Sequence, residues 1–457
     1  MSKLLRLTAL GLVCSVGSAF VWIGCGGEDV PEAQPASPPA PIAQNNGDEG
    51  EDEDGIDGID EPTVPPAPGD TQTPIPSKIR YVLVLVKENH TFDNYFKGFP
   101  GATSSATAKL SNGTTITRKQ APTELMKDIC HSNTCAQDAY AGGKMNGFDA
   151  RDTVRPFYFY SEQQIPNYWQ YARNFVLADH FFATTLGPST PGHMVFWTGQ
   201  STVLDNAKCN AADPASPECK GRGCVAGPQV TITQQDPDTC TTKTVKPCFD
   251  IPTLTDHLPK NFTWTNYGGS IAQMFKSVTN DKAYATHFRS QAQLVTDLQA
   301  GKLANLTVGH LWSGDESEHP EAYPCVGENF TVDIINAAMK LPQWKEMAIV
   351  VTWDDYGGWY DSVTPPVRKC ANGKVFQAGF RVPALVISPY AKKGYVMKKA
   401  LEQASVPRLV EELWGMDFMT ARDKHARDGV VGSMMDAFDF NQVPREAMLL
   451  TKNTCPK

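Results

Sequence analysis

The sequence predicts one three-layer α/β domain, in which helices flank a mostly parallel central sheet. The first observation is the apolar run 81–86, which is short and rich in β-branched residues. Such a run is typical of a strand buried on both faces of a parallel sheet. A second run of this kind spans 348–353. The third observation is that predicted strands alternate with predicted helices along most of the chain, without an internal repeat.

The remaining elements follow from the same hydrophobic patterns. Further strands are predicted at 175–182, 262–268, 305–312 and 381–388. Helices are predicted at 165–174, 291–301, 332–340 and 406–414. A helix is also predicted to begin near Ser189, because Pro191 suits the first turn of a helix.

Charge is distributed unevenly along the 457 residues. Residues 1–78 hold 13 acidic and 3 basic side chains, which leaves 37 acidic and 38 basic side chains for 79–457. The folded part is therefore close to neutral, and it contains no basic block of the kind that binds nucleic acid. A nucleic-acid partner is not expected.

The N-terminal sequence is typical of a targeting segment. Lys3 and Arg6 precede an apolar stretch at 7–23, and a small residue stands directly before Cys25. This pattern resembles a bacterial lipoprotein signal over residues 1–25, with Cys25 acylated as the new N-terminus. Ordinary signal cleavage nearby is the alternative, and a retained transmembrane helix is disfavoured because the apolar run is short.

Residues 26–78 are rich in Pro, Gly, Ala and acidic side chains and lack the apolar content of a packed core. They predict a disordered tether that holds the catalytic domain, 79–457, off a membrane. We therefore expect an exported protein, either anchored at the bacterial cell envelope (outer membrane or surface) or secreted.

Ten cysteines follow the tether, and an even number in an exported chain predicts up to five disulfides. Five of them crowd a Pro/Asp/Thr-rich stretch, which predicts a disulfide-rich insertion at about 205–250. A zinc-knuckle interpretation of that cluster is weak, because the cluster contains no histidine. The ten are Cys130, Cys135, Cys209, Cys219, Cys224, Cys240, Cys248, Cys325, Cys370 and Cys455.

Oxygen-bearing side chains follow the two apolar runs. Glu88 and Asn89 come after the first run, and Asp354 and Asp355 come after the second. Open α/β sheets place ligands beyond the carboxyl ends of their strands, so these groups can share one site if the two strands share a sheet. With Ser189 they form a set of oxygens that suits one hard divalent cation, calcium or one similar to it. A metal-free carboxylate pair, as in glycoside hydrolysis, is the alternative, and nothing else in the sequence supports it.

Ser189 has two interpretations. At a helix N-terminus its hydroxyl would meet unpaired backbone N–H groups, which favour an alkoxide and a bound phosphate. Alternatively, Ser189 or Thr190 only caps the helix. Histidines that converge on Ser189 would supply donors and an acid for phosphoryl transfer. Candidates in or beside polar or Gly/Pro-rich loops are His131, His180, His193, His287 and His319.

Several motifs together resemble the bacterial phosphoesterase family, which contains phosphocholine-preferring phospholipases C and secreted acid phosphatases. The opening motif is 88–96 (ENHTFDNYF), and the nucleophile-loop motif is 186–193 (LGPSTPGH). Later motifs are 316–320 (ESEHP), 353–361 (WDDYGGWYD) and 379–389 (GFRVPALVISP). The resemblance covers about 79–420.

The resemblance implies an alkaline-phosphatase-like fold and a metal-dependent phosphoric ester hydrolase. Glu88, Asn89, Asp354 and Asp355 would hold one metal ion together with Ser189. Ser189 would attack phosphorus and form a phosphoseryl intermediate. Catalytic His131 and His319 would contact the phosphate along with Asn89, and His287 is a further substrate-binding candidate placed only by its neighbourhood.

Three positions depart from the family pattern. Ser362 and Gln403 stand where histidine is frequent, and Gly192 stands where asparagine is common. The serine nucleophile and the Asp-Asp pair favour the acid-phosphatase branch, with phospholipase C action on phosphocholine lipids as the alternative. The substrate would be a phosphate-ester small molecule or a phospholipid head group. A non-catalytic surface binding protein on the same scaffold remains open, and a sulfatase-like role is disfavoured because that chemistry uses a different local motif.

Overall fold

The computed structural model describes residues 77–123, 126–236, 238–269, 271–419 and 432–456. The predicted signal segment, Cys25 and nearly all of the predicted tether therefore lie outside the described residues. The described residues belong to one compact unit. In the described ranges, no helix has both the length and the apolar character needed to cross a membrane.

The central sheet has eight strands in the order β12-β11-β13-β1-β14-β17-β6-β18. Its middle strand, β1 (Tyr81–Lys87), pairs in parallel with β13 (Leu306–His310) and with β14 (Met347–Trp353). In this register Val86 lies opposite His310 on one side and Thr352 on the other. The carboxyl ends of the three strands therefore meet at one edge of the sheet.

The outer strands show one reversal of direction. Strand β17 runs antiparallel to both β14 and β6, whereas β11, β12 and β18 each pair in parallel with a neighbour. The chain passes from β14 to β17 without a crossover helix, and a parallel return would need such a crossover. These strands are β11 (Trp264–Gly268), β12 (Phe288–Arg289), β17 (Ala384–Ile387), β6 (Val176–Ala178) and β18 (Tyr395–Met397).

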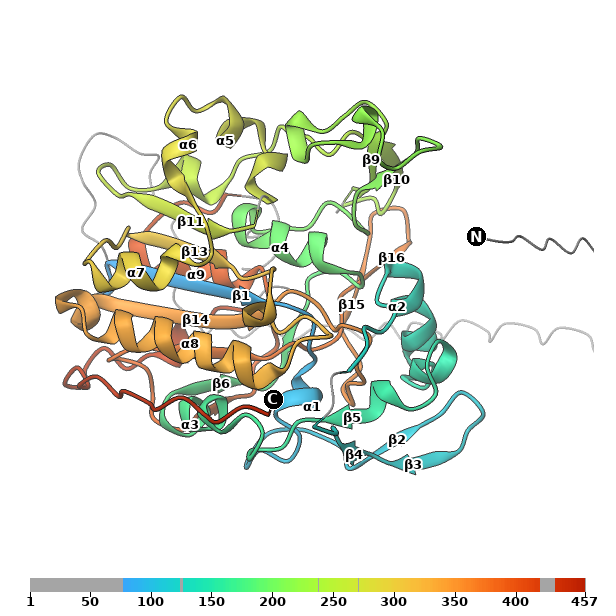
Figure 1. Ribbon diagram of the computed structural model, residues 1–457, viewed down its shortest axis with the longest axis horizontal. Helices are drawn as coiled ribbons and strands as arrows, with labels where there is room; N and C mark the ends of the chain where they lie inside the picture. The colour runs from blue at the N-terminus through green and yellow to red at the C-terminus, as the bar shows by residue number, and fades with distance from the viewer. Residues whose placement is uncertain (1–76, 124–125, 237, 270, 420–431, 457) are drawn as a thin grey trace, which may run out of the picture. The chain divides into compact units, whose positions relative to one another are not determined.

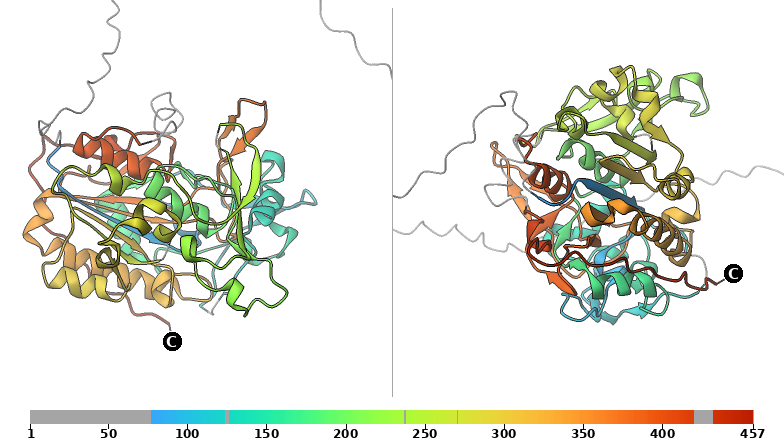
Figure 2. Two further views of the ribbon diagram at one scale, coloured as in Figure 1. Left: turned by 90° about the horizontal axis from the view of Figure 1, so that it is seen from above. Right: turned by 90° about the vertical axis from the view of Figure 1, so that its left-hand side faces the viewer.

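Helices cover both faces of the sheet (Figures 1 and 2). Helices α7 (Gln293–Gln299) and α8 (Pro324–Met339) pack together on one face. Helices α4 (Ser189–Thr198) and α9 (Ser405–Trp414) contact each other on the opposite face. Helix α8 begins earlier than predicted, because Pro324 occupies its first turn, where proline is favoured. The predicted α/β class, with a mostly parallel sheet between helices, is confirmed.

Shorter elements complete the chain. They are α1 (Phe92–Tyr95), β2 (Thr107–Lys109), β3 (Thr115–Thr117), β4 (Lys119–Gln120), α2 (Asn133–Tyr140), β5 (Tyr158–Phe159), α3 (Pro166–Asn174), β7 (Phe181–Phe182), α5 (Lys276–Asn280), α6 (Tyr284–His287) and β19 (Leu401–Glu402).

Five disulfides pair the ten cysteines, as the sequence predicts, and the zinc-knuckle interpretation is wrong. The insertion forms a sheet of β8 (Lys208–Cys209), β9 (Val230–Gln235) and β10 (Thr242–Val245). One disulfide joins it to the hairpin of β15 (Val367–Lys369) and β16 (Val375–Gln377). The pairs are Cys130–Cys135, Cys209–Cys219, Cys224–Cys248, Cys240–Cys370 and Cys325–Cys455.

Candidate active site

Strands β1 and β14 bring their following residues side by side. The backbone N–H of Asp354 donates to the carbonyl of Lys87 at 3.0 Å. In return, the backbone N–H of Asn89 donates to Asp354 Oδ1 at 2.9 Å. The convergence of the two strand ends, predicted from their sequences, is therefore seen in the backbone as well as in the side chains.

Ser189 directs its hydroxyl at both strand ends. Its Oγ lies 3.3 Å from Glu88 Oε2, 3.4 Å from Asn89 Oδ1 and 3.2 Å from Asp355 Oδ2. Pro188 occupies the N-cap position of α4, and no side chain caps the helix there. The hydroxyl therefore faces the carboxylates instead of capping the helix. We call Glu88, Asn89, Ser189, Asp354 and Asp355 the oxygen cluster.

Two glycines allow the backbones of the site to approach closely. A Cβ atom at Gly192, in the first turns of α4, would lie 2.0 Å from the carbonyl oxygen of Asp354. A Cβ at Gly357 would lie 2.2 Å from the carbonyl oxygen of Asn89, and Gly357 has φ of 57°. Asn89 itself has φ of 62°, a left-handed conformation that asparagine tolerates better than most residues. The glycine at 192 therefore has a packing role in this chain.

The carboxylates of the oxygen cluster are buried, whereas Ser189 is partly exposed. Burial raises the pKa of Glu88 to about 7. Burial, together with the negative charge of Glu88, raises the pKa of Asp354 to about 6. Burial and the charge of Asp354 raise the pKa of Asp355 well above its ordinary value. In all three groups burial disfavours the charged carboxylate, and a bound cation would favour it.

The amide of Asn89 tests whether the cluster suits a metal ion. Its oxygen lies 3.1 and 3.2 Å from the two carboxylate oxygens of Asp354 and 3.2 Å from Glu88 Oε2. Without a positive charge these oxygens repel one another, and rotating the amide would turn its NH₂ group toward them. In the rotated orientation the amide donates to these carboxylates and its oxygen accepts from His319 Nε2 at 3.0 Å, whereas a cation among the oxygens would favour the orientation with the amide oxygen toward it. The donor set, all oxygen, fits a hard divalent ion.

His131 and His319 lie at the rim of the oxygen cluster. Their Nε2 atoms lie 3.5 and 3.0 Å from Asn89 Nδ2. The Nδ1 atom of each ring faces a backbone carbonyl, that of Ile129 for His131 and that of Pro320 for His319. Nδ1 therefore carries a proton in both rings, and Nε2 is left to face the site. Asp128 also approaches His131. Asp128, His131 and His319 therefore form a second group with metal-ligand spacing.

A buried network holds the segment that carries His319. Glu318 Oε1 forms an ion pair with Lys87 Nζ at 2.7 Å and accepts from the Tyr168 hydroxyl at 2.5 Å. Glu318 Oε2 accepts from the Tyr95 hydroxyl at 2.8 Å and from Trp353 Nε1 at 3.0 Å. Since Lys87 ends β1 and Trp353 ends β14, the network fixes His319 relative to both strands.

The structure places His287, a predicted substrate-binding candidate, apart from the oxygen cluster. Its ring stacks on Trp264 with 3.9 Å between centroids, and its Nδ1 lies 2.9 Å from the Trp264 carbonyl. Trp264 begins β11 and pairs with Leu306, which in turn pairs with Val82 at the start of β1. His287 therefore lies toward the amino ends of the parallel strands, whereas the oxygen cluster lies beyond their carboxyl ends.

Sequence reasoning named His193 only as one of several candidate histidines, without its partner Glu88, and did not name His310, which contacts His193. His193 Nε2 lies 2.7 Å from Glu88 Oε1, and His193 Nδ1 lies 2.8 Å from His310 Nδ1. Two signals could have indicated them. His193 stands four residues after Ser189 on the same helix, and such residues share a face. His310 is the last residue of β13, which is the kind of strand-end position that identified Glu88.

The two positions that lack the family's histidines make contacts with other groups. The backbone N–H of Ser362 donates to Asp93 Oδ2 at 3.0 Å, within a buried cluster of charges around Arg381. Gln403 is fully buried and donates through Nε2 to the carbonyls of Trp353 and Asp354 at 3.0 and 2.5 Å. Gln403 therefore supports the backbone of the carboxylate pair.

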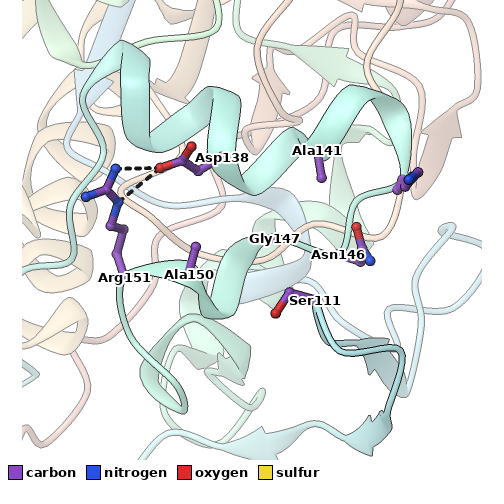
Figure 3. A pocket seen from close by; sticks show the side chains of 8 residues that line it. Ser111, Asp138, Ala141, Asn146, Gly147, Ala150 and Arg151 are labelled. Carbon is purple, nitrogen blue, oxygen red and sulfur yellow. Dashed lines mark hydrogen bonds and ion pairs between the residues drawn. The ribbon is translucent and has the colours of Figure 1, made fainter. Parts of the chain in front are cut away.

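A surface depression of about 460 Å³ lies elsewhere, beside α2 (Figure 3). Asp138 and Arg151 on its wall form an ion pair at 2.6 Å, so their charges offset each other. None of the candidate site residues lines it.

Comparison with known proteins identifies the family. The family model described as "Phosphoesterase family" matches residues 79–417. The chain belongs to the phosphoesterase family. This assignment confirms the resemblance seen in the motifs, and with the relatives described next it identifies the chain as a phosphoric ester hydrolase.

Curated relatives include phospholipases C. Non-specific phospholipase C1 of Arabidopsis thaliana is 24% identical over 81% of this chain and 73% of the relative. Non-hemolytic phospholipase C of Pseudomonas aeruginosa is 24% identical over 79% of this chain, and the match spans only 57% of that longer relative. Among solved structures, a protein in the alkaline phosphatase superfamily from Vibrio parahaemolyticus is similar, with a TM-score of 0.34 and 14% sequence identity. The alignment covers 75% of this chain and 68% of the Vibrio chain.

Proposed function

We propose that this phosphoesterase hydrolyses phosphate esters in a metal-dependent reaction through a phosphoseryl intermediate on Ser189. The observation that carries the proposal is the position of the Ser189 hydroxyl. It lies within 3.4 Å of oxygens of Glu88, Asn89 and Asp355 and is partly exposed, so a substrate can reach it.

Glu88, Asn89, Asp354 and Asp355 would hold one hard divalent cation together with Ser189. When bound, the cation lowers the pKa of the serine hydroxyl and offsets the charge on the phosphoryl oxygens. Ser189 Oγ then attacks phosphorus in line with the leaving group. The N-terminus of α4 adds its positive dipole at the same point.

His131 and His319 would bind the phosphoryl oxygens through Nε2. In both rings Nδ1 carries a proton, so Nε2 needs a second proton to donate a hydrogen bond. A protonated ring can pass this proton to the leaving-group oxygen, and the neutral ring can take one from the water that hydrolyses the phosphoserine. With Ser362 and Gln403 at the positions where histidine is frequent in the family, His131 and His319 are the candidates for proton transfer.

The substrate preference proposed here is that of an acid phosphatase, a phosphomonoesterase. Ser189 and the Asp354–Asp355 pair support it, because the phospholipase branch more often has Thr and Asp-Glu at these positions. Phospholipase C action is the second candidate, and the names of the curated relatives favour it.

The test measures hydrolysis of p-nitrophenyl phosphate, p-nitrophenyl phosphorylcholine and phosphatidylcholine, with and without chelator. We expect turnover of the monoester, loss of turnover with chelator, and loss of at least about 10³-fold in Ser189→Ala, which keeps the fold. Rapid acid quenching with ³²P-labelled monoester should trap label on Ser189. Turnover of the lipid alone would move the enzyme to the phospholipase branch, and no turnover of any substrate would favour a binding protein.

We also propose export and anchoring at the cell envelope through acylated Cys25. The five disulfides support an oxidising compartment, in which such bonds persist. Metabolic labelling with a palmitate analogue in a bacterial host should mark the wild type and leave Cys25→Ser unlabelled. Label on both proteins would contradict acylation at this cysteine.

A further inference from the structure

A chain of buried side chains connects the tryptophan of α4 to a carboxylate of the oxygen cluster. Trp197 Nε1 donates to His310 Nε2 at 2.9 Å. His310 Nδ1 lies 2.8 Å from His193 Nδ1, and His193 Nε2 lies 2.7 Å from Glu88 Oε1. Trp197 and His193 are each 1% exposed, and His310 is fully buried. We call Trp197, His310 and His193 the relay.

The indole fixes the proton positions along the relay. An indole N–H only donates, so His310 Nε2 must accept and carries no proton. His310 then has its proton on Nδ1, which donates to His193 Nδ1. His193 therefore accepts at Nδ1 and carries its proton on Nε2, where it donates to Glu88 Oε1. Both rings are neutral in this scheme.

The proton on His193 Nε2 excludes this histidine as a metal ligand. Glu88, His193 and Asp354 have the spacing of a ligand group, and His193 Nε2 lies 3.6 Å from Asp354 Oδ2. A ligand nitrogen needs a free lone pair. If His193 Nε2 had one, Nδ1 would carry the proton and donate to His310 Nδ1. His310 would then accept at both nitrogens, which a neutral imidazole cannot do.

The relay determines how Glu88 faces the cluster. Its Oε1 is occupied by His193, and its Oε2 points to Ser189 Oγ at 3.3 Å. We propose that His193 and His310 are positioning residues that hold Glu88 as a one-oxygen ligand of the cation. The inference rests on the proposed metal site. A neutral donor orients the carboxylate and leaves its negative charge available, whereas a cationic side chain at 193 would offset part of that charge.

Cation affinity tests the inference without an activity assay. Chelator-treated wild type, His193→Met and His193→Gln are titrated with Ca²⁺ alone and with Mn²⁺ alone by calorimetry. Methionine fills the space without a donor, and we expect affinity to fall about 10- to 100-fold, as for other residues that orient metal ligands. The glutamine NH₂ can replace the Nε2–H donor, so affinity should stay within about threefold of wild type.

The control is His257→Met, the same change at an exposed histidine in η6 (Leu254–His257), which should bind like wild type. Thermal unfolding of each variant in chelator confirms folding. If His193→Met binds both ions as tightly as wild type, the positioning role is overturned and the proposed function stands. If wild type itself binds neither ion, the metal-dependent function fails and the inference falls with it.

A second measurement reads the proton positions directly. Long-range ¹H–¹⁵N spectra are recorded on protein labelled with ¹⁵N-histidine. They should contain the signals of one ring protonated at Nε2, and these signals should be lost in His193→Gln. A second ring protonated at Nδ1 should be lost in His310→Asn. A His193 ring protonated at Nδ1 would overturn the relay and leave the serine mechanism untouched.

Discussion

Ser189 Oγ lies 3.2 Å from Asp355 Oδ2, although 166 residues separate the two in the sequence. One belongs to the first turn of α4 and the other follows β14. The two elements are in direct backbone contact, because Gly192 of α4 rests against the carbonyl of Asp354. The position of the proposed nucleophile and that of the carboxylate pair are therefore set by the same packing contact.

Gly192→Ala should separate Ser189 from the carboxylates. Its Cβ would lie 2.0 Å from the Asp354 carbonyl oxygen, so α4 has to move. We expect a loss of about 10²-fold or more in kcat, because small displacements of reacting groups are costly. Stability should fall by about 1–3 kcal/mol. Kinetics with a phosphate ester and chemical denaturation measure the two effects.

The matched control for this change is Gly113→Ala. A Cβ at Gly113 meets nothing within 4 Å, although its φ of 86° strains a side chain. This variant should lose a little stability and keep its kcat. Equal kinetic losses in both variants would show that the contact between Gly192 and Asp354 has no special role.

The metal-free protein should lose stability as pH rises. The folded-state pKa of Glu88 is raised to about 7 and that of Asp354 to about 6, so the folded state holds protons that the unfolded state has released. Their contribution to stability is fully present below about pH 4 and is lost as pH rises through 6 to 7. A bound cation replaces those protons, so the gain in Tm on adding Ca²⁺ should be larger at pH 8 than at pH 5.

Thermal scans of chelator-treated protein from pH 4 to 8, with and without Ca²⁺, measure this dependence. The difference between paired scans isolates the cation from the other buried groups that titrate. A Ca²⁺-induced gain in Tm that is the same at pH 5 and pH 8 would contradict the assignment of these carboxylates to the cation site.

The sequence was sufficient to predict the four strand-end members of the oxygen cluster, because each follows an apolar strand, whereas Ser189 was preferred to a helix-capping role only through the resemblance to the family. It was not sufficient for the supporting contacts. Which strands are neighbours depends on packing of the whole sheet, and the place of His310 beside His193 follows only from β13 lying next to β1. His287 was misplaced because its proximity along the chain to β11 does not tell which end of that strand it accompanies.

Gln403→Ala should weaken cation binding as well as stability. The Gln403 side chain accepts from the Thr184 N–H at 3.0 Å and donates to the carbonyl that precedes Asp355. Truncation leaves buried backbone groups unpaired, at a cost of about 1–3 kcal/mol each. Because one of these groups belongs to Asp354, we expect the affinity for Ca²⁺ to fall as well, measured by calorimetry.

Gln442→Ala is the matched control, since this amide also donates to two carbonyls, those of Pro389 and Ala391, at 2.8 and 3.3 Å. It should lower stability and leave the affinity for Ca²⁺ unchanged. If both variants keep wild-type affinity, Gln403 supports the fold without supporting the site.

The ion pair of Lys87 and Glu318 should show strong coupling in a double-mutant cycle. Both side chains are fully buried, and their charged atoms lie 2.7 Å apart. Removing one partner leaves the other charge unpaired, so Glu318→Gln and Lys87→Met should each cost about 3–5 kcal/mol in unfolding free energy. The double variant leaves no unpaired charge and should cost clearly less than the sum of the two.

The cycle also separates stability from catalysis. Glu318 directly precedes His319, and its carboxylate joins the residues that end β1 and β14 through Lys87 and Trp353. The double variant should therefore recover stability without recovering kcat, because His319 loses its support from both strands. Full recovery of kcat in the double variant would show that the network stabilises the fold without positioning His319.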